Sequence, residues 1–252
     1  MAYLQVMGRW LTLFICLFAS PVAASETCMV LIHGLGRTPF SLAPMEAVLE
    51  ARGYKVVNAG YASREATIQE LAADTLPPAF AECGSRRINV ITHSMGGILL
   101  RVGLMHDKPD NLGRVVMLAP PNQGSQLVDI MGELAVFDWV GGPAGEQLGT
   151  GPDSLPKSLP PVDYPVGIIA GSQTINPYFS SVVEGADDGK VAVAETFVEG
   201  MAAHLVLPVT HTFMMNNPQV MAQALRFVET GAFADDLSWT EAVDDLASGA
   251  SE

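Results

Sequence analysis

Ser94 stands at a position where a nucleophile is expected. Residues 88–97 predict a buried strand that ends at Ser94 and passes directly into a helix. So sharp a turn strains the serine backbone, exposes its hydroxyl group and requires small residues two positions away on either side. Gly96 meets that requirement, whereas Thr92 meets it imperfectly because its side chain is branched. Ser94 is also the only serine followed two residues later by glycine, so its type and position suit attack on an acyl carbonyl carbon.

A serine hydroxyl needs a base to take its proton, and the base needs an acid to hold it in one tautomer. Among the five histidines, His211 is the best candidate for the base. It follows the last predicted strand and precedes the last predicted helix, which places it at the carboxyl edge of the sheet with Ser94. His204 is the second candidate, and the alternative interpretation of His211 is a lone exposed histidine.

The acid is expected on the loop that follows the predicted strand at residues 166–170. Asp187 and Asp188 stand side by side on that loop, and Gly189 follows them. A glycine after Asp188 lets the backbone turn and aim the carboxylate toward the site. We therefore favour Asp188 over Asp187 and expect one of the two to be a solvated loop charge.

Backbone amides are expected to stabilise the negative charge that develops on the carbonyl oxygen during acyl cleavage. One donor should be the amide of Met95, directly after the nucleophile. The other should come from the turn at residues 32–36, where Gly34 and Gly36 allow close approach, and Leu35 is the expected donor. A phosphate-binding loop is the competing interpretation of these glycines, but the third glycine and the lysine of such loops are missing.

Six short apolar runs rich in β-branched residues predict the strands that would position these groups. They lie at residues 29–32, 54–57, 88–92, 115–118, 166–170 and 205–207. Helical spacing is found at residues 42–51, 66–81, 98–106 and 214–228. The alternation predicts an α/β fold with a mostly parallel sheet, helices on both faces and a ligand site beyond the carboxyl ends of the strands.

Two regions depart from this alternation. Residues 120–165 contain an apolar stretch at 127–140 and then a run rich in glycine and proline, too long for an ordinary connection. A small cap insertion at about residues 121–165 would explain it. Its apolar stretch, with Phe137 and Trp139, could cover an apolar acyl pocket or could equally be packed core. Residues 233–252 carry an acidic excess and predict a peripheral helix or a frayed tail. With no repeat or linker, residues 25–252 are expected to form one domain.

Composition excludes several classes of protein. Of the 252 residues, 49% are hydrophobic, which is too apolar for a disordered chain. A formal net charge of −14 would repel nucleic acid, so no nucleic-acid partner is expected. The sequence has neither a His-Glu-x-x-His motif nor paired cysteine motifs, so no metal site and no cofactor are predicted.

The first 24 residues are interpreted as a secretory signal peptide rather than a retained anchor. Arg9 is followed by the short apolar run 10–19, and small residues at 22–24 offer a cleavage site. The mature protein is then expected to be secreted or periplasmic. Cys28 and Cys83 would be its two cysteines in an oxidising compartment, where they could be paired or could remain buried thiols.

Together these segments resemble the bacterial lipase and esterase branch of the α/β-hydrolase superfamily. The resemblance rests on His33-Gly34-Leu35, on Thr-His-Ser-Met-Gly at 92–96, on Asp188-Gly189, on His211 and on Ala-Pro-Pro-Asn-Gln-Gly-Ser at 119–125. These pieces span almost all of residues 28–230, and the order Ser, Asp, His also matches. The resemblance implies a triad of Ser94, Asp188 and His211 with an oxyanion hole from Leu35 and Met95. Thr92, where the family usually has glycine, is the main departure.

The resemblance also implies a structural and a functional expectation. It sets the strand near Cys28 beside the strand near Ile88, so both cysteines would lie at the amino edge of the sheet as a staple. It leaves structural calcium, which some lipases bind, as an open alternative. The expected activity is cleavage of small-molecule or lipid esters by a secreted serine hydrolase, with transient membrane-surface contact and an undetermined oligomeric state. The alternatives are a non-catalytic binding protein, an acyltransferase and a thioesterase.

Overall fold

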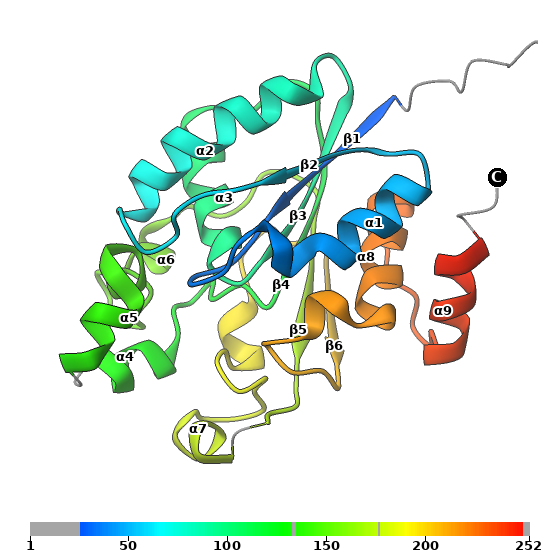
Figure 1. Ribbon diagram of the computed structural model, residues 1–252. Helices are drawn as coiled ribbons and strands as arrows, with labels where there is room; N and C mark the ends of the chain where they lie inside the picture. Colours follow the sequence, from blue (N-terminus) through cyan, green and yellow to red (C-terminus); the bar gives the residue numbers. More distant parts are fainter. Residues whose placement is uncertain (1–25, 133–134, 176, 249–252) are drawn as a thin grey trace, which may run out of the picture.

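A single sheet of parallel strands forms the centre of the molecule (Figure 1). The computed structural model describes residues 26–132, 135–175 and 177–248, without the side chains of 135–140 and 179, so the predicted signal peptide lies outside the described residues. The sheet order is β2-β1-β3-β4-β5-β6, and every neighbouring pair is parallel. The strands are β1 (Thr27–Ile32), β2 (Lys55–Ala59), β3 (Arg87–His93), β4 (Leu112–Leu118), β5 (Val166–Gly171) and β6 (Ala203–Leu207).

All six predicted strands are confirmed, with bounds that differ by no more than three residues. They could be recognised because parallel strands are buried on both faces and are therefore continuous apolar runs. In β1, Val30 and Ile32 pack on one side of the sheet, while Met29 and Leu31 pack on the other. One correction concerns His204, which lies within β6 rather than before it.

Helices cover both faces of the sheet, as predicted (Figure 1). The helices α2 (Ile68–Cys83) and α3 (Met95–His106) pack on one face. The helices α1 (Ala43–Ala51) and α8 (Pro218–Thr230) pack on the other, and α9 (Trp239–Ser248) packs against α8. The acidic tail therefore contains a peripheral helix, which is one of its two predicted states.

Capping residues explain where two of these helices begin. Thr67 and Glu70 form a capping box, so α2 starts at Ile68. The predicted start of the last helix at residue 214 was wrong. Residues Met214–Asn216 form the short 3-10 helix η3, and the Asn217 side chain accepts hydrogen bonds from the first turn of α8.

The long segment after β4 forms separate helices beyond the carboxyl ends of the strands (Figure 1). They are α4 (Gln126–Gly132), α5 (Ala135–Glu146) and α6 (Leu155–Ser158). The apolar stretch predicted at 127–140 is thus divided between α4 and α5. The glycine- and proline-rich run continues α5 across a kink at Gly142, whose φ of 59° suits glycine. Three further short helices are α7 (Pro177–Val182), η1 (Pro39–Leu42) and η2 (Val193–Thr196).

The disulfide between Cys28 and Cys83 confirms the pairing that the sequence left open. Their Cα atoms are 5.5 Å apart, and the bond closes a sequence separation of 55 residues. Cys28 is paired in register with Ile88 on β3, so the disulfide lies at the amino edge of the sheet. Among the described residues, no helix is both long and apolar enough to cross a bilayer.

Candidate active site

Ser94 occupies the sharp turn between β3 and α3. Its φ of 55° and ψ of −128° are unusual for a residue with a side chain, so the backbone is strained here. The amide of Ser94 donates to the carbonyl of Leu118, which ties the turn to β4. A Cβ atom on Gly96 would lie 2.6 Å from the carbonyl oxygen of His33, so only glycine fits where α3 passes the end of β1.

The structure brings Ser94, His211 and Asp188 into one hydrogen-bonded line. The Ser94 Oγ lies 2.9 Å from the His211 Nε2, and the His211 Nδ1 lies 2.8 Å from the Asp188 Oδ2. His211 and Asp188 are 3% and 2% exposed, so the hydrogen bond between them is shielded from water. With its Nδ1–H donated to a carboxylate, the imidazole presents an unprotonated Nε2 to the serine hydroxyl. This arrangement can remove a proton from Ser94.

Of the two adjacent aspartates, Asp188 is the one that contacts His211. The second carboxylate oxygen of Asp188 accepts from the amides of Lys190 and Val191 at 3.0 and 2.9 Å, which aims the first oxygen at His211. Asp187 instead accepts from the Ser180 hydroxyl and from the amide of Gly189, both at 2.7 Å. The expectation that one of the pair would be a solvated loop charge was wrong, because Asp187 is only 6% exposed.

The second candidate for the base is held in a different contact. The Nε2 of His204 lies 2.7 Å from the Thr196 hydroxyl, and its ring stacks on Phe197. His93 is buried beside the site and donates its Nε2–H to the carbonyl oxygen of His211 at 3.0 Å. Burial lowers the pKa of His93 well below its usual value, and the neighbouring His211 lowers it further. A neutral His93 thus supports the backbone of His211.

The two expected oxyanion donors flank Ser94. Met95 begins α3, where the first amides of a helix have no partner within the helix. A Cβ atom on Gly34 would lie 2.9 Å from the Ser94 Cβ, so the turn that carries Leu35 passes directly against the serine. Within the described part of the chain, neither the Leu35 nor the Met95 amide donates to a protein acceptor. Both amides are therefore without a protein acceptor beside Ser94, as donors to an oxyanion would need to be.

Two residues that sequence reasoning missed hold this turn in place. The hydroxyl of Tyr61 donates to the carbonyl of His33 at 2.5 Å, and its ring stacks on the His33 ring. The hydroxyl of Ser63 accepts from the amide of Gly36 at 2.9 Å. Both lie on the loop after β2, and no local motif marks them. Only the pairing of β2 with β1 brings them to the turn.

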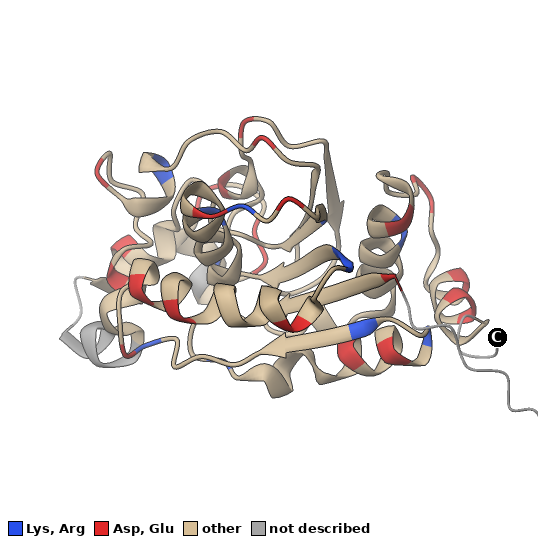
Figure 2. Cartoon of the chain, turned by 90° about the horizontal axis from the view of Figure 1, so that it is seen from above, with Lys and Arg blue, Asp and Glu red and all other residues tan. Residues whose placement is uncertain are grey.

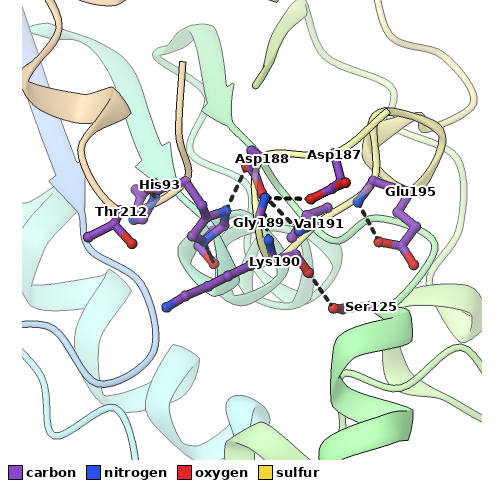
Figure 3. A network of polar contacts seen from close by, with 12 residues as sticks. His93, Ser125, Asp187, Asp188, Gly189, Lys190, Val191, Glu195 and Thr212 are labelled. Atoms are coloured by element: carbon purple, nitrogen blue, oxygen red, sulfur yellow. Dashed lines mark hydrogen bonds and ion pairs between the residues drawn. The ribbon is translucent and has the colours of Figure 1, made fainter. Parts of the chain in front are cut away.

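Glu195 joins the loop of Asp188 to the start of α4. One carboxylate oxygen accepts from the amide of Gln126 and the other from the amide of Ala192, both at 2.7 Å. The Ser125 hydroxyl adds a bond to the carbonyl of Lys190 at 2.8 Å (Figure 3). Burial raises the pKa of Glu195 above its ordinary value. Glu195, which no local sequence motif marks, therefore links the predicted cap to the loop of Asp188.

A cavity of about 250 Å³ opens above Ser94 and His211. Its apolar wall comes mainly from the cap segment and includes Leu127, Val128 and Met131 of α4. The described residues contain no cluster of three His, Cys, Asp or Glu side chains suited to hold a metal ion. The side chains of Phe137 and Trp139, which the sequence suggested as part of an acyl pocket, lie outside the described residues.

Comparison with solved structures identifies the fold. Similar structures include the propeptide form of the Bacillus licheniformis lipase BlEst2 (19% identity, TM-score 0.67, 87% of this chain). Others are the phospholipase PlaB from Legionella pneumophila (17%, 0.62, 89%) and the metagenomic carboxyl esterase MGS0156 (18%, 0.54, 90%). The chain spans 54% of the BlEst2 propeptide form, 62% of PlaB and 77% of MGS0156.

Sequence comparison adds no closer relative, because no protein-family model and no curated protein sequence matches the chain. The structural similarity nevertheless extends over most of the chain. The strand order, the helices on both faces and the neighbouring lipase and esterase structures agree with one another. This chain has the α/β-hydrolase fold.

Proposed function

We propose that this protein is a serine hydrolase that cleaves carboxylic esters through an acyl-enzyme intermediate. The observation that carries the proposal is the continuous line from Ser94 Oγ through His211 to Asp188, with distances of 2.9 and 2.8 Å. A nucleophile, a base and an orienting carboxylate in this geometry are the parts that acyl transfer requires.

In the proposed first half of the reaction, the Ser94 Oγ attacks the ester carbonyl carbon while the His211 Nε2 takes its proton. The carbonyl oxygen becomes an oxyanion, which the amides of Leu35 and Met95 stabilise. The charge on Asp188 stabilises the imidazolium that forms on His211. His211 then gives its proton to the leaving alcohol as the bond between the acyl carbon and the alcohol oxygen breaks.

In the second half, water takes the place of the alcohol. His211 removes a proton from the water as its oxygen attacks the acyl carbon of the ester on Ser94. The same two amides hold the second oxyanion, and its collapse returns the proton to Ser94 and releases a carboxylic acid. A thiol ester in place of the oxygen ester would pass through the same steps.

The lining of the cavity supports esters with an apolar acyl chain. Leu127, Val128 and Met131 of α4 form an apolar part of the cavity wall. Burial of each methylene group of a bound chain against such a wall contributes about 0.8 kcal/mol. A cavity of about 250 Å³ has room for part of such a chain.

A fluorophosphonate probe tests the proposed function. The wild-type protein should be labelled covalently and hydrolyse p-nitrophenyl esters, and the Ser94→Ala variant should lose both properties. Ser125→Ala is a matched control, because Ser125 also lines the cavity but its hydroxyl is bonded to the carbonyl of Lys190. A wild-type protein without labelling or turnover would instead favour the non-catalytic binding role. An acyl-chain series, with and without detergent, would define the substrate.

We also propose that the protein is exported to an oxidising compartment. The Cys28–Cys83 disulfide supports this, because such bonds persist mainly in secreted and periplasmic proteins. Expression of the full chain followed by fractionation and N-terminal sequencing should find a mature protein that begins near Ser25. An uncleaved protein retained in the cytoplasm would contradict the proposal.

A further inference from the structure

Two basic side chains line the cavity beside the proposed catalytic serine. They are Arg37, which follows the oxyanion turn, and Lys190, which follows Asp188 by two residues. The chain has only 13 basic residues against 27 acidic ones, and acidic residues are spread over most of its helices (Figure 2). Neither Arg37 nor Lys190 forms an ion pair within the described part of the chain. Among the described residues, the lining of the cavity thus carries two cationic side chains and no carboxylate.

The half-buried Arg37 is held close to the base. Its Nη2 donates to the carbonyl oxygen of Thr212 at 3.1 Å, and Thr212 directly follows His211. A guanidinium group carries five N–H donors, and this bond uses one of them. The remaining donors suit a carboxylate or a phosphate group at the side of the cavity where His211 lies.

Lys190 is positioned by its backbone, which leaves its side chain available. The amide of Lys190 donates to Asp188, and its carbonyl accepts from Ser125. Figure 3 shows its aliphatic stem extending away from the carboxylates of Asp187 and Asp188. Burial lowers the pKa of the ammonium group, the charge of Arg37 lowers it further, and Asp188 opposes both effects. The two cations are therefore close enough to repel each other, and both line the same cavity.

We infer that Arg37 and Lys190 bind a negatively charged group, a phosphate or a carboxylate, on the alcohol portion of the ester substrate. This inference rests on the proposed function and adds a substrate class to it. Two cations that line one cavity repel each other, and an anion between them would relieve that repulsion. The substrate is thus an ester with an apolar acyl chain and an anionic alcohol.

The position of His211 assigns the anion to the alcohol rather than to the acyl chain. His211 must reach the leaving alcohol oxygen to protonate it, so the alcohol portion lies on the His211 side of the cavity. Arg37 contacts the residue after His211, and Lys190 adjoins the carboxylate that orients it. The apolar wall of α4 remains for the acyl chain.

A matched pair of chromogenic esters tests this inference. The anionic substrate is 3-butanoyloxy-4-nitrobenzoate, and the neutral one is its methyl ester, which has the same acyl chain and the same 2-nitrophenol core. The readout is the ratio of kcat/KM for the anionic ester to that for the neutral ester. The wild-type ratio should exceed the ratio of the uncatalysed hydrolysis rates, and added salt should lower it because salt screens charges.

Variants locate the effect. Arg37→Gln and Lys190→Gln should each lower the ratio by about fivefold, the upper range for an ion pair in contact with water, and the double variant should lower it further. Lys190→Arg should keep the preference because it keeps the charge. Lys55→Gln is the control, since exposed Lys55 begins β2 at the amino edge of the sheet. A structural defect alone would lower both rate constants and leave the ratio unchanged.

The outcomes separate this inference from the proposed function. An unchanged ratio in the double variant, with both esters still hydrolysed by the wild type, would overturn the inference alone. If the variants reduced activity only on the mono-p-nitrophenyl ester of glutaric acid, whose anion is on the acyl side, the assignment to the alcohol would be wrong. If neither ester were hydrolysed and the probe did not label Ser94, the proposed function itself would fail.

Discussion

Replacing Asp188 by asparagine should remove most of the proposed activity while the site keeps its shape. An asparagine oxygen can still accept from the amides of Lys190 and Val191, which hold the present carboxylate at 3.0 and 2.9 Å. The other end of the side chain then presents an NH₂ group to His211. Because two donors cannot pair, the imidazole must turn its unprotonated nitrogen toward residue 188, and its Nε2 can no longer take the proton of Ser94.

The loss of charge can be estimated from the geometry. The Nδ1 of His211 lies 2.8 Å from the Asp188 Oδ2, so the centres of the two charges are about 4 Å apart when the imidazole is protonated. At an effective dielectric constant of about 20 the attraction is about 4 kcal/mol. One factor of ten in rate corresponds to about 1.4 kcal/mol, so the charge alone accounts for about a thousandfold. With the wrong tautomer added, kcat should fall by about a thousandfold or more.

Asp187→Asn is the matched control for this experiment. An asparagine at 187 can accept from the amide of Gly189 and donate to the Ser180 hydroxyl, so the loop should keep its conformation. Both variants should be compared with the wild type for kcat on a p-nitrophenyl ester and for thermal unfolding. Equal loss of activity in both variants, or greater loss in Asp187→Asn, would refute the assignment of Asp188 as the acid.

Two more predictions concern the disulfide and the oxyanion turn. Replacing Cys28 and Cys83 by serine should lower the free energy of unfolding by about 4 kcal/mol in urea titrations, because the bond closes a separation of 55 residues. Kinetics at 25 °C should change little, since the bond lies at the opposite edge from Ser94, and unchanged stability would contradict the estimate. Gly34→Ala should lower kcat by about a hundredfold, because its Cβ atom would lie 2.9 Å from the Ser94 Cβ and displace the Leu35 amide. A kcat equal to that of the wild type would show that this turn does not supply an oxyanion donor.

The sequence predicted the sheet well because burial on both faces leaves a local signal. Each parallel strand is a short apolar run, so all six could be located without knowledge of their neighbours. Helix boundaries depend more on single capping residues. The Thr67–Glu70 capping box is visible in the sequence, and so is Asn217 before Pro218, yet apolar spacing alone placed the last helix four residues too early.

The site was less predictable where it depends on contacts between distant segments. Ser94 could be found because strand, turn and helix are consecutive. Which of two adjacent aspartates faces His211 depends on loop hydrogen bonds that the sequence does not display. Tyr61 is separated by 28 residues from the carbonyl it contacts, so no local pattern could reveal it. Arg37 and Lys190 are 153 positions apart in the sequence, and only the fold brings them to one cavity.

Thr92 shows how a departure from the expected pattern is accommodated. Glycine is expected there to leave room for the turn at Ser94, yet Thr92 is buried without exposure. The room comes from Gly97, where an added Cβ atom would lie 3.3 Å from the Thr92 Oγ1 and 3.0 Å from the Cβ of Pro120. Gly96 is required for a different reason, because a side chain there would collide with the carbonyl groups at the end of β1. Gly96 therefore makes room for the backbone at the end of β1, and Gly97 makes room for the Thr92 side chain. The space that a glycine at position 92 would have left is provided by Gly97 instead.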